Sequence, residues 1–283
     1  MQHRKTFMVD KHSGLKIFTQ FWEPDNAVHA IVVIIHGLGE HSSRYQYIAE
    51  QFCKENIMVY SFDLPGHGKS AGKRAFIKSF DICNVIIDDQ VKILKQNFPG
   101  IPIILLGHSM GGAITAYYAL KKKPEISGII LSSAALKIST DISPVLVKLS
   151  GIIGKIFPTL PTIKLDSTGL SHRYEIIEEY NNDPLVYSGG IPARTGAEIN
   201  RSIKYNQANA EKFNYPVLLI HGNQDKLADY HGSMEFHSKI SSENKTIKIY
   251  KGLYHELMNE VDGDKVIRDL LDWIKSLINQ KEF

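Results

Sequence analysis

The feature that most constrains the fold is an apolar run leading into a serine that lies between two glycines. Residues 103–106 are isoleucine or leucine, G-H-S-M-G follows at 107–111, and residues 113–120 have a helical composition. The G-x-S-x-G pattern is informative when a strand precedes it and a helix follows it, and both conditions are met here. Such a turn holds the serine in a strained conformation with its hydroxyl above the sheet. We therefore predict that Ser109 is a nucleophile.

The rest of the chain predicts a mostly parallel sheet with helices on both faces. Short β-branched runs bounded by Gly, Pro and Asp alternate with longer helix-like stretches. The predicted strands are 30–35, 58–63, 103–107, 128–132, 217–221 and 246–250, preceded by a hairpin of 6–9 and 16–22. The predicted helices are 45–55, 81–97, 111–122, 232–240 and 264–278. Together with the serine turn, this pattern predicts the α/β-hydrolase fold.

The regular alternation breaks in the middle of the chain. The interruption is too long for a loop inside a compact domain, and it contains helix-like patterns of its own. We predict a core made of residues 1–135 and 215–283, with residues 136–214 inserted as a helical cap.

One segment of the predicted cap, residues 144–158, is apolar on most sides. Its only charged residues are Lys148 and Lys155. A helix of this kind is either buried against the main domain or faces lipid. The sequence leaves both interpretations open, and the second predicts reversible contact of the cap with a membrane surface.

Composition and charge exclude several classes of protein. A formal net charge of +3 over 283 residues, with scattered charges, does not indicate a nucleic-acid binder. The basic run 121–123 precedes Pro124 and is typical of a helix C-terminus. Cys53 and Cys83 do not make a disulfide framework and are interpreted as reduced thiols. The first residues lack the apolar region of a secretory signal, so we expect a cytoplasmic protein.

A serine nucleophile requires a general base and a carboxylate that orients it. In the predicted fold these follow the serine in the order acid, then histidine. Asp225 closes a turn directly after the strand predicted at 217–221, and His255 follows the last predicted strand. Both lie where open α/β sheets place their sites. Asp229 is the rival acid, and Asp225 is preferred because it lies nearer the strand.

The oxyanion that forms during acyl transfer needs backbone donors beside the serine. In this fold one N–H comes from the residue after the nucleophile and another from the loop after the third strand. These groups are predicted to be Met110 and Leu38. The chemistry requires no metal and no cofactor.

Several motifs resemble those of one family. They are H-G-x-G-E-H-S-x-R-Y at 36–45, P-G-H-G-K-S at 65–70, G-H-S-M-G-G at 107–112, L-D-S at 165–167, N-D-P-L at 182–185, H-G-N-Q-D at 221–225 and I-Y-K-G-L-Y-H at 249–255. They are similar to the monoglyceride lipase family of α/β-hydrolases, and the resemblance spans nearly the whole chain. The motif at 36–45 is the most specific, since G-H-S-M-G-G is shared by many hydrolases.

The resemblance implies a serine esterase that hydrolyses monoacylglycerols to a fatty acid and glycerol through an acyl-enzyme on Ser109. It further implies an apolar acyl tunnel formed by the cap. The glycerol contacts of the family correspond here to Glu40, Arg44 and Tyr180. A Glu and an Arg four residues apart also commonly form a structural ion pair, so both roles stay open.

Two alternatives remain at this point. The same chemistry could act on a lysophospholipid or a short carboxylic ester, because Arg44 and a basic cap could accommodate a phosphate. A non-catalytic lipid-binding homologue is the second alternative, although such proteins usually lack a member of the triad. In each case the expected partner is a lipid or ester and not a nucleic acid.

Overall fold

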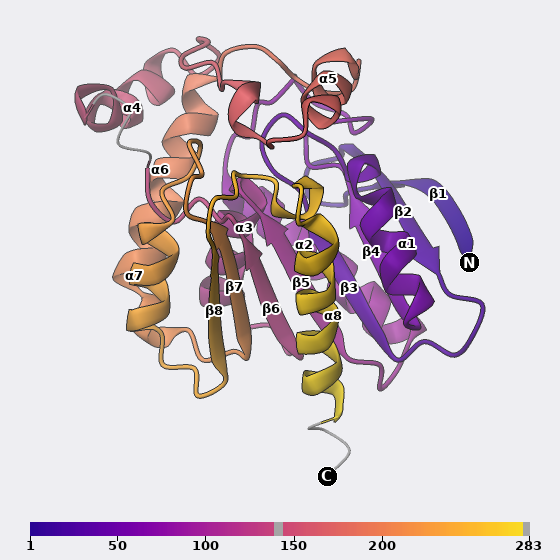
Figure 1. Cartoon of the computed structure of the whole chain (residues 1–283). Coiled ribbons are helices and arrows are strands. Elements are labelled where there is room, and N and C mark those ends of the chain that lie inside the picture. Colours follow the sequence, from indigo (N-terminus) through magenta and orange to yellow (C-terminus); the bar gives the residue numbers. More distant parts are fainter. Residues whose placement is uncertain (139–143, 280–283) are drawn as a thin grey trace.

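The computed structural model describes residues 1–138 and 144–279, and its centre is one eight-stranded sheet (Figure 1). The strand order is β1-β2-β4-β3-β5-β6-β7-β8, with β1 and β2 antiparallel to their neighbours and the others parallel. The strands are β1 (Gln2–Val9), β2 (Lys16–Glu23), β3 (Ala30–Ile35), β4 (Ile57–Phe62), β5 (Ile103–His108), β6 (Gly128–Ser132), β7 (Val217–Gly222) and β8 (Lys245–Tyr250). Residues 139–143 of the predicted cap and 280–283 of the predicted core lie outside the described residues.

The central strands are buried on both faces, which is why the sequence located each of them to within one residue at either end. In β3, Ile31 and Val33 pack toward α2 and α3, whereas Val32 and Ile34 pack toward α1 and α8. Figure 1 shows the latter pair of helices in front of the sheet. The helices are α1 (Gln46–Lys54), α2 (Phe80–Asn97), α3 (Met110–Lys122) and α8 (Gly263–Asn279).

The first hairpin is longer than predicted. Strand β1 begins at Gln2 and pairs with β2 along its whole length, whereas the sequence predicted a strand only from residue 6. An edge strand with mostly exposed side chains carries no alternation of apolar and polar residues, so its backbone pairing leaves little trace in the sequence.

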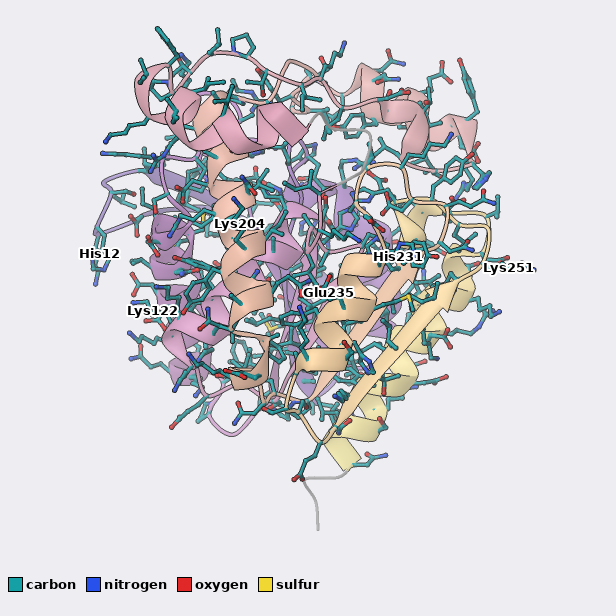
Figure 2. All side chains as sticks on the ribbon, turned by 90° about the vertical axis from the view of Figure 1, so that its left-hand side faces the viewer. His12, Lys122, Lys204, His231, Glu235 and Lys251 are labelled. Atoms are coloured by element: carbon teal, nitrogen blue, oxygen red, sulfur yellow. The ribbon has the colours of Figure 1, made fainter. Side chains whose placement is uncertain are left out.

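The chain between β6 and β7 holds several helices. They are α4 (Pro144–Ile156), the 3₁₀ helix η2 (Ser167–Gly169), α5 (Tyr174–Asn182), α6 (Ala193–Ala208) and the 3₁₀ helix η3 (Ala210–Lys212). Figure 1 shows α4 and α5 above the upper edge of the sheet, while α6 descends beside α7 (His231–Lys239). Figure 2, in which the left-hand side of Figure 1 faces the viewer, shows Lys204 of α6 and Glu235 of α7. In the part of the chain that the structure describes, no helix is long and apolar enough to span a bilayer.

Both cysteines are free and buried, which predicts resistance to thiol reagents. Burial raises the pKa of Cys53 to about 11 and that of Cys83 to about 12, so neither supplies a reactive thiolate at neutral pH. Iodoacetamide is expected to leave esterase activity nearly unchanged under native conditions. Mass spectrometry should find both thiols labelled only after denaturation. Rapid inactivation accompanied by labelling of the native protein would contradict this expectation.

Candidate active site

Ser109 lies between the end of β5 and the start of α3, in a backbone conformation that side chains rarely adopt. Its φ and ψ angles are +53° and −120°. The glycines on either side of it have no room for a side chain. A Cβ on Gly107 would lie 2.4 Å from Thr115 Oγ1, and one on Gly111 would lie 2.1 Å from the carbonyl oxygen of Ile35. The structure therefore confirms the predicted tight, strained turn.

Asp225 and His255 meet beyond the carboxyl ends of β7 and β8. The His255 Nδ1 atom lies 2.6 Å from Asp225 Oδ2, and both side chains are almost completely buried. The other carboxylate oxygen accepts the N–H groups of Leu227 at 2.8 Å and Ala228 at 3.0 Å. Since a carboxylate only accepts hydrogen bonds, Nδ1 of His255 carries the proton and Nε2 is the basic nitrogen.

The environment of His255 supports its use as a base. Burial alone would lower its pKa, but the charge of Asp225 and the hydrogen bond to it raise the pKa above its ordinary value. The same contacts act on the acid: burial opposes ionisation, while His255 and His221 bring the pKa of Asp225 well below its usual range. The carboxylate is therefore ionised at neutral pH.

The rival acid, Asp229, is engaged elsewhere. Its Oδ1 atom accepts the backbone N–H of His231 at 2.9 Å and lies 2.7 Å from the ring Nδ1 of that residue. Its Oδ2 atom pairs with Lys137 at 3.2 Å. Figure 2 shows His231 near the start of α7. Asp229 thus belongs to a partly exposed cluster, and the geometry favours Asp225 as the partner of His255.

Ser109 and His255 line one small cavity of about 30 Å³, together with Leu38 and Tyr180. Leu38 and Tyr180 also line a cavity of about 330 Å³, whose walls include residues 164–167 of the segment that follows α4. Ile191 borders both this larger cavity and a third one of about 100 Å³, which has mainly apolar walls between α4 and α6. The three cavities follow one another from the serine toward α4.

The two predicted oxyanion donors are brought to the serine. Met110 is the first residue of α3, so its N–H has no acceptor within the helix. Leu38 borders the same cavity as Ser109, and it follows Gly37, where a Cβ would lie 3.2 Å from Ser109 Cβ. Both backbone segments therefore flank the hydroxyl on which the chemistry would occur.

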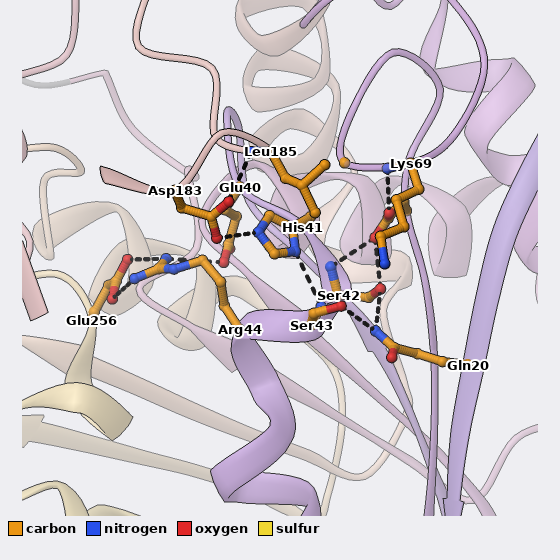
Figure 3. A network of polar contacts seen from close by, with 12 residues as sticks. Gln20, Glu40, His41, Ser42, Ser43, Arg44, Lys69, Asp183, Leu185 and Glu256 are labelled. Carbon is orange, nitrogen blue, oxygen red and sulfur yellow. Dashed lines mark hydrogen bonds and ion pairs between the residues drawn. The ribbon is translucent and has the colours of Figure 1, made fainter. Parts of the chain in front are cut away.

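Glu40 and Arg44 form the ion pair that the sequence left open, and Glu256 extends it (Figure 3). The Arg44 guanidinium donates to the two oxygens of Glu256 at 2.6 and 2.9 Å and to Glu40 Oε2 at 3.3 Å. Its central carbon lies 4.8 Å from the ring centroid of Tyr180. The predicted glycerol-binding residues thus meet at Arg44, whose guanidinium pairs with two carboxylates and lies near the Tyr180 ring.

Glu40 also fixes the loop that carries Leu38. Its Oε1 atom accepts the Gly37 N–H at 2.6 Å and the Tyr45 hydroxyl at 2.8 Å. Burial disfavours the charged carboxylate, but His108, Arg44 and the Gly37 N–H together hold the pKa of Glu40 below its usual range. An ionised carboxylate that accepts from Gly37, Tyr45 and Arg44 therefore sets the path of the backbone beside the serine.

The same loop is attached to the chain that follows α5. His41 Nε2 lies 2.8 Å from Asp183 Oδ2, as Figure 3 shows, and the Tyr187 N–H donates to the Gly39 carbonyl at 2.7 Å. One contact joins two side chains and the other joins two backbones. The loop is consequently braced from within by Glu40 and tied to the chain after α5 by these two bonds.

Comparison with known proteins identifies the family. The profile of the family described as serine aminopeptidase, S33, matches residues 26–262. The monoacylglycerol lipase of Mycolicibacterium smegmatis is 34% identical over 265 residues, which is 93% of this chain and 94% of that protein. The chain belongs to the monoglyceride lipase family of α/β-hydrolases. The predicted fold is thereby confirmed, and as a family member the protein is a carboxylic ester hydrolase.

Two further relatives agree with this membership of the monoglyceride lipase family. The crystal structure of Paleococcus ferrophilus monoacylglycerol lipase superimposes with a TM-score of 0.84 at 32% identity, covering 93% of this chain and 98% of that one. The phospholipase YtpA of Bacillus subtilis is 33% identical over 87% of this chain and 95% of its own length. The similarity therefore extends to proteins with different named substrates.

In this monoglyceride lipase family member, sequence reasoning missed three residues around the predicted triad. Glu256 was missed because nothing in the pattern indicates that it pairs with Arg44 across 212 positions. His108 has its ring centroid 4.8 Å from that of His255, and burial lowers its pKa to about 4. His221 lies 3.0 Å from Asp225 Oδ2. The H-G-N-Q-D motif contained His221, but its spacing gave that histidine no role.

The described residues contain no group of three or more His, Cys, Asp or Glu side chains arranged to hold a metal ion.

Proposed function

We propose that the protein hydrolyses monoacylglycerols to a fatty acid and glycerol, with Ser109, Asp225 and His255 as its catalytic triad. The observation that carries the proposal is the shared cavity of Ser109 and His255, next to the buried hydrogen bond from His255 to Asp225. The monoacylglycerol lipases among its relatives support this substrate class.

The mechanism follows from the protonation of the histidine. His255 Nε2 removes the proton of Ser109, whose oxygen attacks the ester carbonyl, and the Leu38 and Met110 N–H groups stabilise the oxyanion. Glycerol leaves with the proton held by His255, and an acyl-enzyme remains on Ser109. Water then attacks this ester by the same general base catalysis and releases the fatty acid.

The cavities suit an ester with one acyl chain and a small polar head. The acyl chain would extend from the serine along the cavities that end between α4 and α6. Glycerol would contact Glu40 and Tyr180, which line the cavity at Ser109, while Arg44 holds both of them in place. Glycerol hydroxyls both donate and accept, so they match a carboxylate and a phenol.

A lysophospholipid is the competing substrate, since one relative is a phospholipase. The charges around Arg44 disfavour it. The guanidinium is already paired with Glu40 and Glu256, so the cluster carries one more negative than positive charge and would repel a phosphate. To reach Arg44, a phosphate head would have to displace a buried carboxylate, and an ionised carboxylate has no hydrogen to donate to the phosphate.

Fatty-acid release from 1-oleoylglycerol, measured beside release from oleoyl-lysophosphatidylcholine, tests the proposal. We expect faster release from the monoacylglycerol, and no release by protein whose serine has been blocked with a fluorophosphonate. Preference for the lysophospholipid would move the substrate to that class. Fluorophosphonate labelling without release from either lipid would direct the search to other esters, and failure to label would favour a lipid carrier.

We further propose that residues 136–214 act as a cap on a core formed by residues 1–135 and 215–283, and that the cap meets the membrane reversibly. Ile152, Ile156 and Phe157 are 58%, 61% and 60% exposed on or just after α4. A row of exposed apolar side chains on one helix is typical of interfacial binding. Because Cys53 and Cys83 are unpaired, we place this membrane contact on the cytoplasmic side.

Replacing Ile156 and Phe157 together with aspartate is expected to weaken binding to lipid vesicles by about tenfold or more, because both changes remove apolar contact area. Vesicle sedimentation measures the binding. Hydrolysis of a soluble short-chain ester should stay unchanged. The matched control is Val9→Asp, at an equally exposed apolar residue on β1 (62% exposed). Equal vesicle binding by the double variant, the control and the wild type would contradict membrane contact through α4.

A further inference from the structure

Asp225 is held by two histidines, and only one of them belongs to the predicted triad. His255 Nδ1 and His221 Nε2 both lie within hydrogen-bonding distance of the same carboxylate oxygen, Oδ2, at 2.6 and 3.0 Å. The other oxygen is occupied by two backbone N–H groups. The side chains of Asp225 and His221 are both fully buried.

The surroundings of His221 fix where its proton lies. Its Nε2 atom faces only acceptors, namely Asp225 Oδ2 and the Ala228 carbonyl at 3.2 Å, so Nε2 must carry a proton. Its Nδ1 atom lies 2.8 Å from Ser233 Oγ, and this contact sets the rotation of the ring. His221 is therefore a donor aimed at the acid of the triad.

We propose that His221 is a positioning residue for catalysis, whose Nε2–H holds the Asp225 carboxylate so that Oδ2 faces His255. This inference rests on the proposed triad and deepens it. With both donors present, Oδ2 has no free lone pair and the carboxylate cannot rotate about its last bond. Without His221, one lone pair of the buried Oδ2 has no donor, which is costly and loosens the position of Oδ2 opposite His255, while the Leu227 and Ala228 N–H groups still hold Oδ1.

His221 also competes with His255 for the negative charge of Oδ2. A second donor on that oxygen weakens the bond that stabilises the imidazolium form of His255. Removal of His221 should therefore raise the pKa of His255. The other charged or titratable groups near His255 are Glu256, Glu40 and His108, and a substitution at position 221 leaves them in place.

A matched pair of variants separates the donor from the volume of the side chain. In His221→Gln the amide nitrogen is as many bonds from Cα as Nε2 is in histidine, so it can donate to Asp225. In His221→Met a methyl group occupies that position and nothing is donated. We expect kcat of the Gln variant within about threefold of wild type, and kcat of the Met variant lower by about tenfold with KM unchanged.

The pH profile distinguishes the proposed hydrogen-bond donor from a residue that only fills space, because a purely structural role would leave the profile unchanged. The acid limb of kcat/KM should shift upward by about half a pH unit in the Met variant and stay in place in the Gln variant. Equal kinetics and pH profiles in a folded Met variant would overturn the proposal. So would a Gln variant as impaired as the Met variant.

Two controls keep the result interpretable. Wild-type activity that is not abolished by fluorophosphonate labelling would refute the proposed function itself, before His221 is considered. Should the Met variant not fold, nitrogen-15 spectra of histidine-labelled wild type give the answer directly. They should show a proton on Nε2 of His221 at neutral pH, and a proton on Nδ1 alone would overturn the proposal.

Discussion

Ser109→Ala is expected to lower kcat for ester hydrolysis by about 10⁴-fold or more, because it removes the only proposed nucleophile while leaving His255 and the oxyanion donors in place. Alanine at this position takes on the same left-handed φ of +53° that serine already adopts. The backbone conformation should therefore persist, and the temperature of unfolding should change little. The residual rate would come from substrate binding and the backbone donors alone.

Hydrolysis of 1-oleoylglycerol, fluorophosphonate labelling and a thermal melt should be compared for this variant. The matched control is Ser238→Ala, which removes a hydroxyl from the exposed face of α7. The control should label and turn over as the wild type does. Turnover near wild type in Ser109→Ala would remove the serine from the mechanism, whatever the labelling shows.

Asp225→Asn is expected to lower kcat by about 10⁴-fold, with Asp229→Asn within about threefold of wild type. The backbone N–H groups of Leu227 and Ala228 both point at Oδ1, so the amide oxygen will take that position. The amide NH₂ must then face both His255 Nδ1 and His221 Nε2, because an imidazole can change its tautomer whereas a backbone N–H cannot. His255 Nδ1 becomes an acceptor, its proton moves to Nε2, and His255 can no longer accept the proton of Ser109.

Kinetics on both variants, with nitrogen-15 spectra of His255, test this reasoning. The expected spectra show Nδ1–H in wild type and in Asp229→Asn, and Nε2–H in Asp225→Asn. If Asp229→Asn were the inactive variant, the assignment of the acid would be exchanged. Equal loss in both variants would indicate that neither carboxylate acts alone.

Much of the fold could be predicted because the central strands are buried on both faces, and continuous β-branched runs such as Ala30–Ile35 are a strong local signal. The serine turn was equally local, since its strand, glycines and helix are adjacent in the chain. Strand β1 was underestimated because its pairing is made by the backbone and its side chains are mostly exposed. Local sequence patterns thus identify buried strands and miss strands that are held only by backbone hydrogen bonds.

The meeting of Asp225 and His255 was predictable, because both follow the carboxyl ends of neighbouring parallel strands. The site was not predictable where a role depends on a partner distant in sequence. The sequence left Arg44 open between glycerol contact and an ion pair with Glu40, and it gave no sign of Glu256, which only the folded chain brings near. His221 is close to Asp225 in sequence, yet its function follows from the direction of one ring nitrogen, which no pattern of residue types records.

The attachment of the loop at 36–45 to the chain after α5 bears on how the protein folds. The backbone that carries the proposed Leu38 donor is held by the His41–Asp183 contact and by the Tyr187 N–H, and Asp183 and Tyr187 both belong to the long insertion between β6 and β7. A folding intermediate with a complete sheet but an unseated insertion would lack these restraints. We therefore expect the reactive centre to be complete only once the insertion is seated, and we expect local opening of the insertion to release the loop beside Ser109.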